Sequence, residues 1–228
     1  MSDCYIVAST KAWHHVTFEA RKDVVLGRWL YVSSPEELEC AVRDNSPSIV
    51  FFLHWNWQVP RDIWSLHECI CFHMTDVPFG RGGSPLQNLI EMGCSETVLS
   101  ALQMVEEMDA GPVYAKRPLS LDGRAEEIYR RAGEICWELI DWIIEERPQP
   151  VPQRGVVTRF KRRKPEQSLL PSSGELRKIY DHIRMLDAPT YPSAFLRHGN
   201  FVIEFSHAQL GDAGVSACVV IREMKTEN

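Results

Sequence analysis

The sequence predicts an α/β fold built on a mostly parallel β-sheet. Short apolar runs alternate with helical segments through the first half of the 228-residue chain. One run, Ser48–His54, is almost continuously apolar, which is typical of a strand covered on both faces. Strand and helix alternate in the order that favours right-handed crossovers. Because such sheets bind ligands outside the carboxyl ends of their strands, residues that follow strands are the first candidates for a site.

Each expected element rests on a local pattern. Apolar runs bounded by turn residues predict strands, serine followed by proline predicts a helix start, and apolar residues at helical spacing predict the long helix. The expected strands are Cys4–Ala8, Trp29–Val32, Ser48–His54, Cys69–His73 and Pro112–Leu119, with Thr97–Met108 extended. The expected helices are Lys11–Ala20, 33–43, Arg61–Leu66, Ser84–Met92 with Ser84 as its cap, and Asp122–Glu146.

A proline cluster that follows Arg147 predicts a domain boundary. It divides the chain into a larger domain, residues 1–150, and a small C-terminal α+β region, residues 151–228. The small region should hold a capped helix at Ser172–Leu186 and two strands within Phe201–Phe205 and Ala217–Ile221.

The composition argues against several classes of protein. A formal net charge of −6 and a pI of about 5.8 do not indicate a large basic surface for nucleic acid. The seven cysteines show neither a disulfide framework nor the paired spacing of a zinc site, so we expect no metal and a reducing, cytoplasmic setting. We also expect no membrane segment.

His73 and Asp109 are the first catalytic candidates. The histidine ends an apolar run, a loop rich in glycine and proline follows it, and Asp109 stands at the next sharp turn. A histidine with a carboxylate nearby can act as a general base. The alternative is a hydrogen-bonded core histidine and an aspartate that only caps a turn.

The context of these two residues resembles a known family. His73, the following Arg81-Gly82-Gly83-Ser84-Pro85 and the later Asp109-Ala-Gly111 are similar to the catalytic domain of formyltransferases that use 10-formyltetrahydrofolate. The segment Leu176–Phe195, ending in Tyr-Pro-Ser-Ala-Phe, resembles the sugar nucleotide N-formyltransferases of that family. The resemblance covers roughly residues 48 to 200 and implies a Rossmann-like formyltransferase domain within residues 1–150.

The sequence departs from the family at one position. The family carries an asparagine two residues before the histidine, and Cys71 occupies that position here. A thiol is a poor hydrogen-bond donor to a developing oxyanion. Asn56, just beyond the neighbouring expected strand, is the candidate to replace it, and Asn88 is the weaker one. The alternative is that Asn56 is only a turn residue between two tryptophans.

The resemblance implies direct transfer without a metal. The acceptor amine attacks the formyl carbon, His73 takes the amine proton, Asp109 orients His73, and Asn56 donates to the oxyanion. The folate would contact the loop from Val77 to Gly83 and Asp109, mainly through backbone groups. These cofactor-binding candidates are Val77, Phe79, Gly80, Arg81, Gly82, Gly83 and Asp109. Lys11 and Trp57 are candidates to bind the other substrate.

The acceptor is expected to be a nucleotide-linked amino sugar, with no nucleic acid partner; a homodimer is left open. The acidic charge and the short C-terminal region support this choice over an aminoacyl-tRNA or a carrier-bound aminoacyl group. Basic residues between Arg154 and Lys164 could contact a diphosphate or tRNA, or merely protect a strand edge. A third hypothesis is a non-catalytic folate- or nucleotide-binding module in which Cys71 marks lost activity.

Overall fold

The computed structural model describes residues 3–189 and 191–224 of the chain. It contains two compact units that interleave along the sequence. Unit 1 comprises residues 1–82, 98–119 and 130–159, and unit 2 comprises residues 83–97, 120–129 and 160–228. The two units therefore do not separate at residue 150, because the segments 83–97 and 120–129 pack with the C-terminal region. The division into a catalytic domain, residues 1–150, and a small C-terminal region, residues 151–228, stays a prediction.

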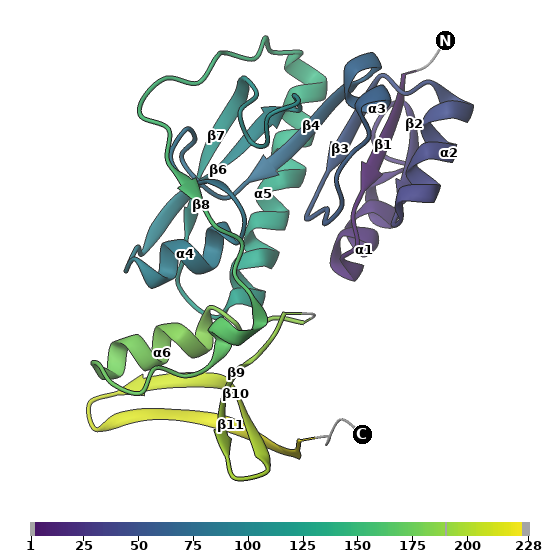
Figure 1. The fold of residues 1–228 in the computed structure, drawn as a ribbon. Coiled ribbons are helices and arrows are strands. Elements are labelled where there is room, and N and C mark those ends of the chain that lie inside the picture. The colour runs from purple at the N-terminus through teal and green to yellow at the C-terminus, as the bar shows by residue number, and fades with distance from the viewer. Residues whose placement is uncertain (1–2, 190, 225–228) are drawn as a thin grey trace. The chain divides into compact units, whose positions relative to one another are not determined.

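A central sheet organises unit 1 (Figure 1). Within the described residues its strand order is β2-β1-β3-β4-β6-β7. β1 pairs in parallel with β2 and β3, β3 pairs in parallel with β4, and β6 is antiparallel to β4. This confirms the predicted α/β fold with a mostly parallel sheet. The strands are β1 (Cys4–Ala8), β2 (Arg28–Val32), β3 (Ile49–Phe52), β4 (Glu68–His73), β6 (Glu96–Gln103) and β7 (Val113–Ser120).

Helices cover both faces of this sheet. On one face α2 (Pro35–Asn45) and α3 (Arg61–Leu66) pack against alternate residues of the central strands, including Ile6 and Val50. On the other face lie α1 (Ala12–Arg21) and the long α5 (Ala125–Glu146), whose end is tied to β1 by the Arg147–Tyr5 hydrogen bond of 2.8 Å. Because helices cover both faces of the sheet, the central strands consist of almost continuous runs of apolar residues.

Unit 2 contains α4 (Pro85–Glu91), α6 (Leu176–Arg184) and an antiparallel sheet of order β11-β10-β9. The two expected C-terminal strands are longer, β10 (Phe201–Gly211) and β11 (Gly214–Glu223), and β9 (Ala194–His198) is a strand that the sequence analysis missed. A short ladder joins β5 (Arg81–Gly82) to β8 (Arg159–Phe160), and a 3-10 turn spans Pro165–Ser168.

Three local expectations were wrong. Ser84 precedes α4 but its side chain does not cap the helix, because its left-handed backbone turns the hydroxyl toward the Arg163 amide, 3.0 Å away. The helix expected from Ser172 begins only at Leu176 and also lacks a side-chain cap. The extended segment expected up to Met108 ends at Gln103, where the chain turns.

Among the residues described, no helix combines the length and the apolar character that a membrane crossing requires.

Candidate formyl-transfer site

His73 ends β4 in unit 1 and is almost fully enclosed, with 8% of its side chain exposed. Its Nε2 lies 2.8 Å from the carbonyl oxygen of Gly80. A carbonyl oxygen only accepts hydrogen bonds, so Nε2 carries a proton in this conformation. The loop after β4 therefore folds back onto the histidine and occupies one of its two ring nitrogens.

Asp109 reaches the other ring nitrogen of His73. Its Oδ2 lies 3.5 Å from His73 Nδ1, an ion-pair distance for a protonated ring, and it accepts a 2.8 Å hydrogen bond from the Gly82 amide. Asp109 has a left-handed backbone with φ of 55°, which aspartate tolerates better than most residues. Gly111 completes the turn because a Cβ there would lie 1.7 Å from the Gln103 carbonyl oxygen. The structure thus brings the two predicted catalytic residues together.

The loop candidates for folate binding are already hydrogen-bonded within the protein. Every amide N–H from Phe79 to Gly83 donates to a protein acceptor. The acceptors are, in order, the Asp76 carbonyl, the Thr158 hydroxyl, the Thr158 carbonyl, the Asp109 carboxylate and the Phe160 carbonyl. Val77 is buried, and its carbonyl accepts a hydrogen bond from Lys116. Ligand contact through loop amides would therefore require the loop to rearrange.

Gln153 is a residue of this site that the sequence analysis missed. Its amide nitrogen donates to the carbonyl oxygens of Asp109 and Gly111, both at 2.8 Å. Its amide oxygen accepts two hydrogen bonds from the Arg81 guanidinium, at 2.8 and 3.1 Å. Gln153 lies just after the proline cluster, where nothing in the local pattern signals contact with a turn more than forty positions earlier.

Cys71 occupies β4 two residues before His73 and is partly buried. Burial, with a smaller contribution from the negative charge of Asp109, raises the pKa of its thiol well above the ordinary value. The side chain is therefore a neutral thiol at physiological pH. This agrees with its being a poor substitute for an amide donor.

The structure does not join Asn56 to His73 through any hydrogen bond among the described residues. Asn56 is exposed in the loop after β3, and its proposed catalytic role stays a prediction. The side-chain amide of Asn88 donates to the carbonyl oxygens of Ser84, Gly83 and Lys161 in unit 2. That amide is fully used, which removes Asn88 as a candidate oxyanion donor in this conformation.

The two substrate-binding candidates lie in unit 1. Lys11 directly precedes α1, and partial burial lowers the pKa of its ammonium group. Trp57 is 45% exposed and packs edge-on against Trp55, with ring centroids 4.9 Å apart. No contact of either residue tests its proposed role.

Among the described residues, no cluster of His, Cys, Asp or Glu could hold a metal ion. The expectation of a metal-free reaction stays a prediction.

The fold matches that of a class of enzymes, the formyltransferases. The family described as methionyl-tRNA formyltransferase, C-terminal domain, matches residues 165–222. A solved structure described as methionyl-tRNA formyltransferase from Clostridium thermocellum is 41% identical, with a TM-score of 0.93 over 97% of this chain and 99% of that one. The chain belongs to the methionyl-tRNA formyltransferase-like family.

A curated relative from Myxococcus xanthus, a methionyl-tRNA formyltransferase, is 28% identical over 157 residues. That match covers 62% of this chain and 50% of the relative. The chain thus spans about half the length of this curated relative.

The comparisons correct the expected acceptor. A sugar N-formyltransferase from Shewanella is only 14% identical, with a TM-score of 0.65 over 99% of both chains, so it shares the fold alone. The expectation of an amino-sugar acceptor rested on the segment Leu176–Phe195. This segment lies inside the stretch that matches the C-terminal domain of methionyl-tRNA formyltransferase. A nucleotide-linked amino sugar is therefore the wrong expectation. The short C-terminal region does not argue against tRNA, because the 41% identical chain is matched over almost its full length.

Proposed function

We propose that the protein transfers the formyl group of 10-formyltetrahydrofolate to the α-amino group of an aminoacyl-tRNA. The observation that carries this proposal is the 41% identity, over nearly the whole of both chains, to a structure described as methionyl-tRNA formyltransferase. Formyltransferases of this family use 10-formyltetrahydrofolate. The net negative charge of the chain is compatible with a tRNA acceptor, because Lys161, Arg162 and Lys164 are exposed and can contact phosphates locally.

His73 is the proposed general base. An amine attacks a formyl carbon only as it loses a proton, and a histidine held by a carboxylate can accept that proton. With Nε2 bonded to Gly80, the lone pair of a neutral His73 ring faces Asp109 instead of a substrate. When the Gly80 carbonyl releases Nε2, the ring proton can move to Nδ1, which then donates a hydrogen bond to the Asp109 carboxylate. Nε2 then becomes the free base.

Asp109 has two proposed roles. Its negative charge stabilises the protonated ring of His73 after proton transfer, and its bond to the Gly82 amide fixes the loop relative to the histidine. Gln153 holds the backbone of the Asp109 turn from the other side. The charge that develops on the formyl oxygen needs a hydrogen-bond donor, and Asn56 is the proposed one.

The loop residues that remain suited to bind the folate are those that offer hydrogen-bond acceptors. A pterin ring carries N–H donors, and these match backbone carbonyl groups or the Asp109 carboxylate better than amides that are already bonded. Residues 79–83 and Asp109 are thus the proposed folate contacts, with the loop shifted far enough to free Gly80 from His73.

An acceptor panel tests the proposal. The purified protein is incubated with 10-formyltetrahydrofolate and methionyl-tRNA, then with methionine alone and with uncharged tRNA, and N-formylmethionine is measured by mass spectrometry after hydrolysis. We expect formylation only with methionyl-tRNA. Folate binding without turnover on any acceptor would instead favour a non-catalytic module, and formylation of free methionine would contradict tRNA recognition.

A further inference from the structure

Thr158 joins the segment that follows the proline cluster to the loop after β4, and both lie in unit 1. Its hydroxyl oxygen accepts a 2.7 Å hydrogen bond from the Gly80 amide. Its backbone N–H donates to the Pro78 carbonyl, and its backbone carbonyl accepts a bond from the Arg81 amide, both at 3.1 Å. One residue therefore holds the loop at three points, on both sides of Gly80.

These bonds set the direction of the Gly80 carbonyl. The C=O and the N–H of a planar trans peptide group point in opposite directions. The Gly80 carbonyl and the Arg81 amide belong to one such group, so the amide that faces Thr158 turns the carbonyl away from it. That carbonyl oxygen lies 2.8 Å from His73 Nε2. Because the Thr158 hydroxyl holds the preceding peptide group as well, Thr158 fixes both peptide groups that flank the Gly80 Cα.

The backbone of Gly80 needs such a hold because it is easily turned. Its φ is 69°, in the left-handed region that glycine enters at little cost. Gly80 is buried, and a buried amide without an acceptor is unfavourable. The Thr158 hydroxyl is the acceptor that the protein supplies. A side chain without a hydroxyl at position 158 would leave this amide unpaired and favour rotation of Gly80 toward another acceptor.

Two side chains donate to the Gly80 carbonyl oxygen. His73 Nε2 does so at 2.8 Å, and the hydroxyl of the buried Thr75 does so at 3.4 Å, which is a longer and weaker bond. A small shift that breaks the His73 bond therefore leaves the oxygen with the Thr75 hydroxyl. The contact between His73 and Gly80 can break without leaving a buried carbonyl unpaired.

We propose that Thr158 is a positioning residue, which keeps the Gly80 carbonyl on His73 Nε2 until folate shifts the loop. This inference rests on the proposed function, in which His73 is the general base. While Gly80 accepts the bond, a neutral His73 ring carries its proton on Nε2 and presents no lone pair there. The Thr158 hydroxyl thus couples the position of the loop to the tautomer of the base.

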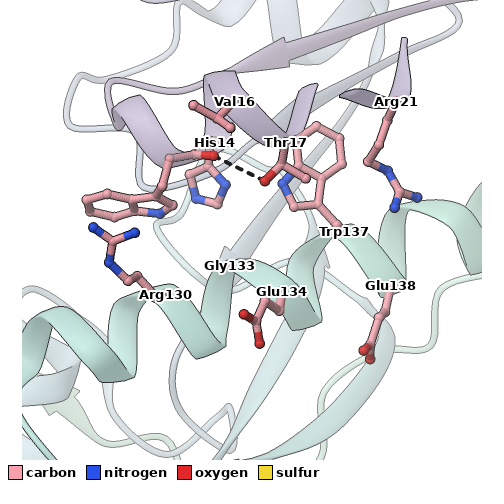
Figure 2. Close-up of a pocket in the computed structure, with 10 residues that line it drawn as sticks. His14, Val16, Thr17, Arg21, Arg130, Gly133, Glu134, Trp137 and Glu138 are labelled. Carbon is pink, nitrogen blue, oxygen red and sulfur yellow. Dashed lines mark hydrogen bonds between the residues drawn. The ribbon is translucent and has the colours of Figure 1, made fainter. Parts of the chain in front are cut away.

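Three variants isolate the hydroxyl. Thr158→Val removes it but keeps a β-branched side chain, so the backbone bonds to the loop can persist. Thr158→Ser retains the hydroxyl and tests for rescue. Thr17→Val is the matched control, because the Thr17 hydroxyl donates to the Trp13 carbonyl within α1 at 3.1 Å (Figure 2). Thr17 lines a groove whose lining includes neither His73 nor the loop after β4.

Steady-state kinetics give one readout. Thr158 opposes the loop shift that folate binding requires in our account, so Thr158→Val should lower the KM for 10-formyltetrahydrofolate about two- to fivefold. Thr158→Ser and Thr17→Val should leave this KM unchanged. A higher KM in Thr158→Val would overturn the proposal, because the loop held by Thr158 would then be the form that binds folate.

The tautomer of His73 is the decisive readout, and it needs neither folate nor tRNA, so its failure is distinct from a failure of formyl transfer. Two-bond ¹H–¹⁵N spectra of the ¹⁵N-histidine-labelled full chain are recorded at about pH 9, where an ordinary histidine is neutral. The signals absent from His73→Asn identify His73.

We expect mainly the Nε2–H form of His73 in the wild type, in Thr158→Ser and in Thr17→Val. Thr158→Val should raise the population of the Nδ1–H form at least about threefold. An unchanged tautomer in a folded Thr158→Val protein would overturn the proposal, and so would a Thr158→Ser protein that behaves like Thr158→Val. A wild-type ring mainly in the Nδ1–H form would overturn it without any variant.

Discussion

His73 Nε2 donates a 2.8 Å hydrogen bond to the carbonyl oxygen of Gly80, so the loop that follows the histidine holds its ring in place. On the other side Asp109 Oδ2 binds the Gly82 amide and lies at ion-pair distance from Nδ1. One carboxylate thus links the histidine and the loop. Movement of the loop must change the proton distribution on His73, which makes this contact the connection between ligand binding and proton transfer in our account.

Asp109→Asn should lower kcat for formyl transfer by about 10²–10⁴-fold. The asparagine oxygen can still accept the hydrogen bond from Gly82, so the loop stays anchored, but the negative charge beside His73 is lost. Steady-state kinetics with methionyl-tRNA and a thermal unfolding curve provide the measurement. A variant with near-normal kcat and an unchanged melting temperature would show that the charge has no catalytic role.

Gln153→Ala should lower both kcat and the free energy of unfolding. It removes hydrogen bonds to Asp109, Gly111 and Arg81, and a group left buried without its partner costs about 1–3 kcal/mol. Gln153→Glu retains an acceptor for Arg81 but cannot donate to the turn, so it should lose activity with a smaller loss of stability. Urea unfolding and kcat measure the two effects, and the exposed Gln209→Ala serves as the control. Normal activity in Gln153→Glu would show that the turn needs no support from this residue.

Asn56→Ala should reduce kcat by about 10²–10³-fold if Asn56 donates to the developing charge on the formyl oxygen. Cys71→Ala should have little effect, because a partly buried neutral thiol is a weak donor. Introducing Cys71→Asn into the Asn56→Ala variant should restore part of the lost activity, since it returns an amide to the position used by the family. The assignment fails if Asn56→Ala is fully active while Cys71→Ala is inactive.

Acid should destabilise the protein through the buried His14–His54 pair. Burial, together with nearby positive charge, lowers the pKa of His14 to about 3 and that of His54 to about 4. An unfolded histidine titrates near its ordinary value of 6.5, so between that pH and about pH 4 the unfolded chain binds more protons than the folded chain. The stability that comes from this pair is complete above pH 6.5 and is lost as the pH falls through this window.

Urea unfolding at neutral pH and at about pH 5 measures this loss. Replacing both histidines by glutamine should make the difference in unfolding free energy between the two pH values smaller. His15→Gln, at an exposed position on the same helix, should leave that difference unchanged. An equal acid-induced loss in the double variant and the wild type would assign the acid sensitivity to other groups.

The sequence predicted much of unit 1 because its strands are buried on both faces. Continuous apolar runs placed β1, β3 and β4 within one or two residues of their observed bounds. The same reasoning placed His73 at a strand end and Asp109 at a turn, and the structure brings the two together. Such features follow from local patterns that a single sequence displays.

Other parts of the site depend on contacts between distant segments. Gln153 and Thr158 lie in a proline-containing segment with no periodic pattern, yet they bond to the Asp109 turn and to Gly80. β9 was missed because Ala194–His198 lacks a long apolar run. The acceptor was predicted wrongly because a short motif near Tyr191 occurs in a segment that the methionyl-tRNA enzymes also match. Neither local propensity nor a short motif distinguishes between acceptors of one family.

Formyl transfer to methionyl-tRNA by the wild type and by His73→Asn tests the central claim most directly. N-formylmethionine released from the tRNA is quantified at saturating 10-formyltetrahydrofolate, and circular dichroism verifies that the variant is folded. We predict robust formylation by the wild type and a loss of about 10²–10⁴-fold in His73→Asn, because the substitution removes the imidazole that we propose as the general base. Formylation by a folded His73→Asn protein at the wild-type rate would contradict the account.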